Sequence, residues 1–473
     1  MYFPLVRSNF WVHPDIAETL YTGSKMLGGK KLYVDWLNVN PPAIYQISEL
    51  SEKLASVFYL PSVIFYYSLF LILSFVGFLL LKKSLEDSPI PKTSIPFYLL
   101  GYIGCIVGVS FAGPYEFSQR EHWFVICFIP YCLGRFGQLK EKRLLTIWCV
   151  LLGFIASMKP GFLLLVLTYE LVIILLKRPW SWRIFVSILS GLVLPYLILG
   201  LQSGQSLKAF FTWAVPSYKY YYVGYQEEWS FLLITLKAYP LMIFMPFMFF
   251  GFLIYYRHEK NELSIIALLL VFVSFLNVIV QHKFWNHLFI PMFGICLFFL
   301  YGEIARIKNK FVYPLCLLPL CFWTFQGFKL SSLPSYYAEE TSRFYSLMPS
   351  RKVLLLTENV TSLASAYFSR VNLIGPWVFL HTFSGVLSEP DQQIKKRELT
   401  KIRNDILTSL DKESPELILI DDGYSLNGVD LAPMLEKRLF LISIFKNRGY
   451  HLLSDESVDS CCFGTGRFFV YKK

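Results

Sequence analysis

Residues 11–46 read WVHPDIAETLYTGSKMLGGKKLYVDWLNVNPPAIYQ and decide the fold of this chain. They form the longest polar interval before the strongly apolar segments begin. The interval carries Asp15, Glu18 and Asp35 close to a predicted membrane surface. Carboxylates at such a surface are costly unless they have a partner or a function. The interval is therefore the first place to look for a functional site.

The first half of this interval predicts a short helix. Asp15, directly after Pro14, suits an N-cap, and Glu18 three residues later suits the reciprocal capping contact. Apolar and small residues recur at helical spacing until Gly28-Gly29, a pair that favours a helix end. We expect an amphipathic helix lying in the membrane interface.

The second half predicts an extended piece and a turn. Residues 32–35 favour an extended backbone, and Asn40-Pro41-Pro42 forces a turn because neither proline can donate a hydrogen bond. A second helix should begin near Ala43.

The composition indicates an integral membrane protein. Of the 473 residues, 55% are hydrophobic and only 16% are charged, which excludes an ordinary soluble fold of this length. A net charge of +11 would suggest a nucleic-acid partner in a soluble protein. Here the basic residues cluster in short loops between apolar runs, so membrane topology explains the charge and no nucleic-acid partner is expected.

The apolar runs predict an α-helical polytopic membrane protein with about ten transmembrane helices, since a span needs roughly 20 residues. The candidate segments are residues 57–81, 96–112, 122–136, 144–158, 161–177, 184–202, 229–255, 263–281, 287–304 and 311–328. The fourth and fifth are separated only by Lys159-Pro160-Gly161 and should form a tight hairpin.

Lysine and arginine predict the orientation of these helices. They concentrate in alternate loops, which should therefore be cytoplasmic. Residues 11–46, 113–121, 203–228, 282–286 and everything after about 329 then lie on the outer side. Residues 1–10 are too short to span and resemble no signal peptide. Either a first helix lies upstream of this chain, which we favour, or the N-terminus is translocated unaided.

The end of the chain changes character. Short β-prone runs at residues 352–356, 371–374, 416–420 and 467–471 alternate with polar helical stretches. We predict a transmembrane domain over residues 1–328, with a first outer loop at 11–56, and a small extracytoplasmic α/β domain over 329–473.

The predicted outer loops together carry carboxylates and cations at one membrane face. Sugar transfer from a lipid phosphate needs a base to activate the acceptor hydroxyl and positive charge to stabilise the departing phosphate. The candidate acids or bases are Asp15, Asp35 and Glu116, and the candidate phosphate-binding residues are Arg120, Lys159, Lys283 and His287.

Each candidate also has a purely structural interpretation. Asp15 could be a helix cap, Asp35 a loop hydrogen-bonding group, and Glu116 with Arg120 a surface ion pair. Lys159 could be a turn residue, while Lys283 and His287 could be interfacial anchors. His282 with His287 does not make a metal site, because the spacing is wrong for one helix face and no third ligand is evident. No cofactor is therefore expected, although a divalent cation stays an open alternative.

Residues 14–45 resemble the first extracytoplasmic loop of GT-C-fold glycosyltransferases, particularly bacterial relatives of protein mannosyltransferase and of the lipid A aminoarabinose transferase. Asp15 matches the catalytic acid of that family, and Pro41-Pro42 match its prolines after a position where some relatives carry a charge and this chain has Asn40. The segments GPYEFSQREHWF at 113–124 and QHKFWNHLFIP at 281–291 are similar to further loops of the subfamily.

The resemblance implies an inverting transfer of a hexose or pentose from a polyprenyl-phosphate donor to a lipid, glycan or protein acceptor. The expected location is the outer face of a bacterial-type inner membrane, as part of cell-envelope, lipopolysaccharide or glycan modification. Two alternatives stay open: a flippase or transporter of lipid-linked sugars, and a catalytically inactive scaffold of the same fold. The sugar, the acceptor and the oligomeric state do not follow from the sequence.

Overall fold

The computed structural model describes residues 13–108, 117–137, 139, 141–224, 229–230, 232–233, 262–284, 286–304, 352–357, 366–367, 371–375, 381–425, 432–460 and 464–472. The predicted helix at 311–328, most of the one at 229–255, and Glu116 lie outside these residues. The predicted domain boundary near residue 328 lies outside them as well.

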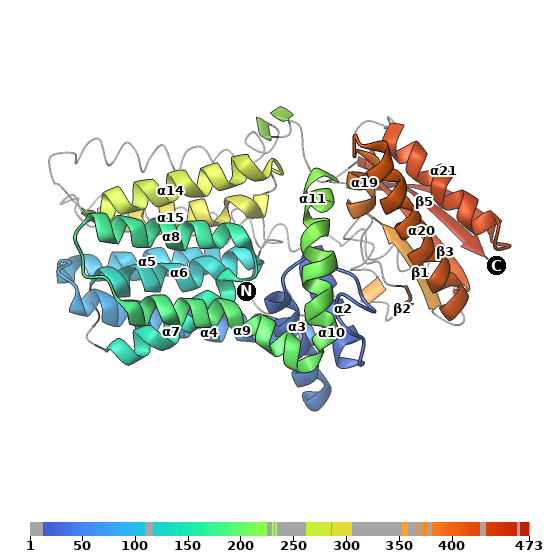
Figure 1. Cartoon of the computed structure of the whole chain (residues 1–473). Helices are drawn as coiled ribbons and strands as arrows, with labels where there is room; N and C mark the ends of the chain where they lie inside the picture. Colours follow the sequence, from blue (N-terminus) through green and yellow to red (C-terminus); the bar gives the residue numbers. More distant parts are fainter. Residues whose placement is uncertain are drawn as a thin grey trace.

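The described part of the chain has three regions, which Figure 1 shows in order: a helical bundle, a group of loop helices and a C-terminal α/β domain. The bundle consists of α4 (Ser62–Asp87), α5 (Ile95–Gly108), α6 (Arg120–Phe136), α7 (Lys142–Ala156), α8 (Pro160–Leu175), α9 (Trp182–Gln202), α14 (Glu262–Gln281) and α15 (Ile290–Ile304). A short 3-10 turn, η1 (Lys92–Ser94), precedes α5, and another, η5 (Asn286–Phe289), precedes α15.

The bundle confirms eight of the predicted apolar segments as helices. By length and composition, α4, α9, α14 and the helical stretch His287–Ile304 could each cross a membrane, and α8 is a shorter apolar helix. The predicted hairpin is present, because α7 ends at Ala156 and α8 begins at Pro160. The fold is that of a multi-pass membrane protein.

Close helix contacts in the bundle rely on glycine. An ideal Cβ built on Gly153 of α7 would lie 2.1 Å from the Ile188 carbonyl oxygen, and one on Gly191 of α9 would lie 2.0 Å from the Val150 oxygen. In a membrane no hydrophobic force drives helices together, so they associate by close packing. Small residues allow the helix backbones to approach closely enough for this packing.

The loop helices are α2 (Pro14–Leu27), α3 (Pro42–Phe58), α10 (Gly204–Ala209), the π-helical turn η4 (Phe210–Ala214) and α11 (Val215–Gly224). Helix α2 packs directly on α3, and an ideal Cβ on Gly23 would lie 2.6 Å from the Glu49 backbone nitrogen. Ile16, Ala17 and Leu20 are buried in the main core. The polar residues Glu18, Thr19 and Thr22 are buried too. Helix α2 is therefore covered by protein on its polar side as well as on its apolar side.

Two local predictions for this region are wrong. The N-cap of α2 is His13, whose Nδ1 accepts the Asp15 backbone N–H, and Asp15 is the second helical residue. Residues 32–36 form a tight turn instead of an extended piece. Tyr33 has a φ of 65° there, and the Asp35 carboxylate accepts a hydrogen bond from the Lys31 backbone N–H.

The C-terminal domain is a mixed sheet with helices, as predicted. Its strand order is β2-β1-β3-β5-β4, with β1 (Lys352–Thr357), β2 (Asn372–Leu373), β3 (Leu417–Ser425), β4 (His451–Ser460) and β5 (Gly464–Lys472). Strands β1 and β3 are parallel, with Leu354 opposite Ile418, whereas β3 and β5 are antiparallel. The domain also contains α19 (His381–Leu387), α20 (Gln392–Glu413) and α21 (Ala432–Lys446).

Helix α2 also contacts this domain. The Tyr21 hydroxyl donates to the Val371 carbonyl at 2.9 Å and accepts from the Leu373 N–H at 2.8 Å. Lys25 Nζ donates to the Asn372 side chain at 2.7 Å and to the Leu373 carbonyl at 3.0 Å. The segment that decides the fold thus lies between the bundle and the α/β domain (Figure 1).

Candidate functional site

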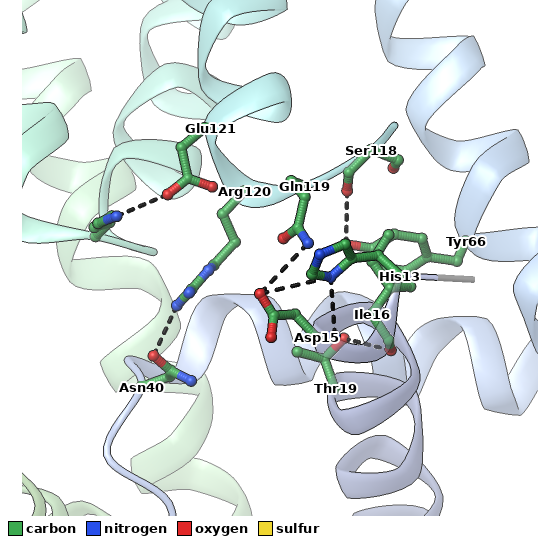
Figure 2. Close-up of polar contacts among 11 residues, drawn as sticks. His13, Asp15, Ile16, Thr19, Asn40, Tyr66, Ser118, Gln119, Arg120 and Glu121 are labelled. Carbon is green, nitrogen blue, oxygen red and sulfur yellow. Dashed lines mark hydrogen bonds and ion pairs between the residues drawn. The ribbon is translucent and has the colours of Figure 1, made fainter. Parts of the chain in front are cut away.

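Asp15 lies where the first turn of α2 meets the start of α6. Its carboxylate Oδ2 is 3.4 Å from Gln119 Nε2 and 3.6 Å from His13 Nδ1 (Figure 2). Because His13 Nδ1 already accepts the Asp15 N–H, it carries no proton to share with the carboxylate. His13 therefore fixes the backbone that carries Asp15.

Arg120, the first residue of α6, provides a cation next to Asp15. Its Nη1 donates to the Asn40 side-chain oxygen at 2.7 Å, so Asn40 orients the guanidinium (Figure 2). The proline pair after Asn40 begins α3, and this turn brings Asn40 to α6. The site thus joins the first loop to the second.

Lys159 joins the site from the hairpin between α7 and α8. It occupies the N-cap position of α8, and its ammonium group forms a buried 2.7 Å ion pair with Glu121 Oε1. Glu121 Oε2 is buried and has no hydrogen-bond partner among the described residues. This ion pair connects the hairpin to α6 beside Arg120.

Lys283 and His287 come from the loop between α14 and α15. Both are buried, although each carries a group that favours water. The residues on either side of Lys283, His282 and Phe284, have φ values of 53° and 47°. Residues other than glycine rarely adopt this left-handed backbone conformation. Backbone strain of this kind is concentrated at functional sites.

The electrostatics show that these groups act on one another. Burial alone would raise the pKa of Asp15, but His13, His287 and Arg120 outweigh it and hold the pKa below its usual value. Asp15 is therefore ionised at neutral pH. Burial, followed by the charges of Lys159 and Arg120, places the pKa of Lys283 well below its ordinary range.

A second carboxyl group, Glu18, lies one turn further along α2. Burial and the charge of Asp15 raise its pKa to about 8. At neutral pH the site therefore combines an ionised Asp15 with a protonated Glu18.

The structure brings together Asp15, Arg120, Lys159, Lys283 and His287 of the predicted residues. It does not bring Asp35 to them, because Asp35 closes the turn at Lys31. Neither His13 nor Glu121 is predicted from the sequence as a site residue. The positions of both next to predicted residues, two before Asp15 and one after Arg120, are the only sequence signals that could have pointed to them.

A candidate cation site overlaps this cluster. His13, Asp15 and His287 each offer one ligand atom, and these atoms lie within 4.8 Å of one another. Two imidazoles and a carboxylate suit a divalent transition metal better than magnesium. The positive charges of Arg120 and Lys159 oppose a bound cation and favour a bound anion.

No family model and no curated protein matches the sequence. Among solved structures, the chain is similar to the crystal structure of ArnT from Cupriavidus metallidurans bound to undecaprenyl phosphate, with a TM-score of 0.54 and 12% sequence identity. The similarity covers 97% of this chain and 94% of the ArnT chain. It confirms the expected GT-C fold with its C-terminal α/β domain.

Proposed function

We propose that this protein is a membrane glycosyltransferase that moves a single sugar from a polyprenyl-phosphate donor to an acceptor hydroxyl at the outer face of the membrane. The observation that carries the proposal is the ionised Asp15 carboxylate held beside the Arg120 guanidinium and two basic side chains, Lys159 and Lys283. The shared fold with ArnT, crystallised with undecaprenyl phosphate, supports a polyprenyl donor.

Asp15 is assigned the role of general base. An acceptor hydroxyl is a poor nucleophile until a base takes its proton, and a positioned base contributes about 10²- to 10⁴-fold in rate. The low pKa of Asp15 keeps it ready to accept that proton at neutral pH. A direct attack by the activated hydroxyl on the sugar carbon would invert the configuration at that carbon.

The cations are assigned to the phosphate of the donor. Negative charge increases on the phosphate as the bond to the sugar breaks, so fixed positive groups stabilise the transition state. Arg120 can grip phosphate oxygens with parallel hydrogen bonds, and Asn40 orients its guanidinium. A phosphate near Lys283 would favour its protonated form and offset the effect of Lys159 and Arg120 on its pKa.

The test is a transfer assay with the purified protein in nanodiscs, radiolabelled polyprenyl-phosphate sugars, and a panel of lipid, glycan and peptide acceptors. We expect Asp15→Asn to lower the transfer rate about 10²-fold or more, because an amide cannot act as a base. The fold should survive, because His13 and not Asp15 caps α2.

The matched control is Asp35→Asn, which makes the same chemical change in the same loop. Among the described residues, the Asp35 carboxylate accepts the Lys31 N–H, a contact that an asparagine oxygen can keep, so transfer should stay near the wild-type rate. Full activity of Asp15→Asn would remove Asp15 from the mechanism. Donor binding without transfer to any acceptor would favour the scaffold, and transfer of lipid-linked sugar across the bilayer would favour a flippase.

A further inference from the structure

A chain of buried and partly buried hydrogen bonds leads from Glu18 to Arg120. Glu18 Oε1 accepts from Asn38 Nδ2 at 2.5 Å, and Asn38 Oδ1 accepts from the Asn40 backbone N–H at 3.1 Å. Asn40 Oδ1 in turn accepts from Arg120 Nη1 at 2.7 Å. The first link joins α2 to the turn before α3, the second lies within that turn, and the third joins the turn to α6.

This chain of hydrogen bonds is well defined because its residues have few alternative partners. Glu18 is only 2% exposed, and Asn38 is buried as well. The Asn40 side-chain nitrogen Nδ2 donates to the Tyr45 hydroxyl at 3.2 Å, and the Asn40 backbone carbonyl accepts from the Tyr33 hydroxyl at 2.6 Å. With these groups engaged, the Asn40 side-chain oxygen has one orientation, toward Arg120.

We propose that Glu18 is a positioning residue for donor binding, which acts through Asn38 and Asn40 to hold the Arg120 guanidinium where the donor phosphate binds. The inference rests on the proposed function for the nature of the donor. It adds to that function a residue that touches neither donor nor acceptor.

Glu18 performs this role as an acceptor of hydrogen bonds and not as a base. Thr22 Oγ1 donates to the same oxygen that Asn38 contacts, at 3.1 Å. Burial raises the pKa of Glu18 to about 8, so the group is protonated at neutral pH. Asp15 on α2, Arg120 on α6, Tyr33 in the turn and Tyr45 on α3 are the titratable or charged groups around it.

The experiment measures the Kd for a polyprenyl phosphate and the transfer kinetics in nanodiscs. We expect Glu18→Ala and Asn38→Ala each to raise the Kd about tenfold, which corresponds to losing about 1.4 kcal/mol. Glu18→Gln should restore most of the affinity, because its amide oxygen can accept from Asn38. Thr22→Val is the control: it removes the Thr22 contacts to Glu18 and to the Trp36 indole N–H and leaves the link from Glu18 to Asn38, so the Kd should change less than twofold.

A double-mutant cycle separates positioning from general damage. In the Arg120→Ala background, Glu18→Ala should change the Kd by less than about twofold, since the group that it positions is gone. Additive effects, or a wild-type Kd for Glu18→Ala, would overturn the inference. If the wild-type protein itself neither bound polyprenyl phosphate nor transferred sugar, the proposed function would fail instead.

A structural role has a different signature. If Glu18→Ala is too unstable to purify, Asn38→Ala and Glu18→Gln carry the test. A Glu18→Gln variant that binds as poorly as the alanine variant would show that the amide oxygen does not replace the carboxyl group, and would also contradict the inference.

Discussion

At the scale of single residues, the position of Asp15 follows from the residue two places before it. His13 accepts the Asp15 N–H and caps the N-terminus of α2, so the carboxylate projects from the first turn toward α6. A carboxylate in the first turn is stabilised by the helix dipole. The Arg120 guanidinium adds positive charge nearby. The result is an ionised acid that is partly buried and held in place.

Arg120 gives a prediction about donor binding. Arg120→Ala should raise the KM for the polyprenyl-phosphate donor about 10- to 100-fold, since hydrogen bonds to charged groups contribute about 1.5 to 3 kcal/mol. The KM for the acceptor should hardly change. The measurement is initial-rate kinetics at varied donor concentration, with Arg397→Ala on the exposed face of α20 as the control. Equal loss of affinity for donor and acceptor would contradict a phosphate role.

Glu18 gives a prediction about pH and stability. Its folded-state pKa is about 8 against an ordinary 4.5, so the folded chain retains a proton that the unfolded chain releases. This contribution to stability is fully present below pH 4.5 and is lost as the pH rises to about 8. Asp15, Arg120, Tyr33 and Tyr45 surround Glu18 in both wild type and variant, so their own titration cancels in the comparison.

The Glu18→Gln variant should therefore gain stability relative to wild type as the pH rises from 5 to 8, and should match it most closely at the acidic end. Apparent Tm values in detergent across this range check the difference. Glu86→Gln, on the exposed end of α4, is the control and should run parallel to wild type. A wild-type Tm that runs parallel to that of Glu18→Gln over this window would show that Glu18 is ionised in the folded state and would contradict the raised pKa.

The site was predictable from the sequence only in part. The loops that contribute to it follow from their polar residues between apolar runs, so Asp15, Arg120, Lys159, Lys283 and His287 could be named. Their partners could not, because the contact between Glu121 and Lys159, for example, depends on how α6 and α8 pack. The hydrogen bonds that connect Glu18 to Arg120 could not be predicted either, because they depend on the tertiary structure.

At the scale of helices and strands, packing in the bundle depends on where side chains are missing. Gly153 and Gly191 face the backbone of the opposite helix, so α7 and α9 approach more closely than any larger residue would allow. Gly23 does the same for α2 and α3. The contact between α2 and α3 matters for function, because α2 carries Asp15 and Asn40 lies just before α3.

Gly153→Leu should lower the apparent Tm strongly. A side chain there would meet the Ile188 carbonyl, a backbone atom that cannot rotate away, and overpacking typically costs about 1 to 3 kcal/mol or more. Thermal unfolding in detergent measures the effect. Gly204→Leu is the control, since an added Cβ there meets nothing within 4 Å. An unchanged Tm for Gly153→Leu would show that α7 and α9 are not packed this closely.

Sequence periodicity predicts the elements better than their connections. Apolar length was enough for the bundle helices, and alternating β-prone runs were enough for β1, β2, β3 and β5. Strand β4 was missed because HLLSDESVDS is polar, as befits a strand at the edge of the sheet. The turn at residues 32–36 was missed because nothing in the sequence marks the positive φ of Tyr33.

At the scale of the whole molecule, α2 contacts both halves of the protein. It packs on α3 beside the bundle, and Tyr21 and Lys25 hold it to strand β2 of the α/β domain. Tyr21 and Lys25 thus connect the helix that carries Asp15 to the C-terminal domain. We therefore expect this domain to affect the site near the N-terminus.

Tyr21 allows this dependence to be tested. Tyr21→Phe removes the hydroxyl that accepts the Leu373 N–H and donates to the Val371 carbonyl. The 3.1 Å contact between that N–H and that carbonyl remains, and each buried hydrogen bond that is lost costs about 0.5 to 1.5 kcal/mol. We expect the Leu373 amide to exchange its hydrogen at least tenfold faster, and the transfer rate to fall while the bundle keeps its thermal stability. Hydrogen exchange followed by mass spectrometry measures the first effect, and the transfer assay the second.

Tyr450→Phe is the matched control, because it removes a hydroxyl that binds Pro415 inside the α/β domain and leaves the contact with α2 intact. If Tyr21→Phe speeds exchange at Leu373 but leaves transfer at the wild-type rate, the α/β domain is attached to α2 without positioning Asp15.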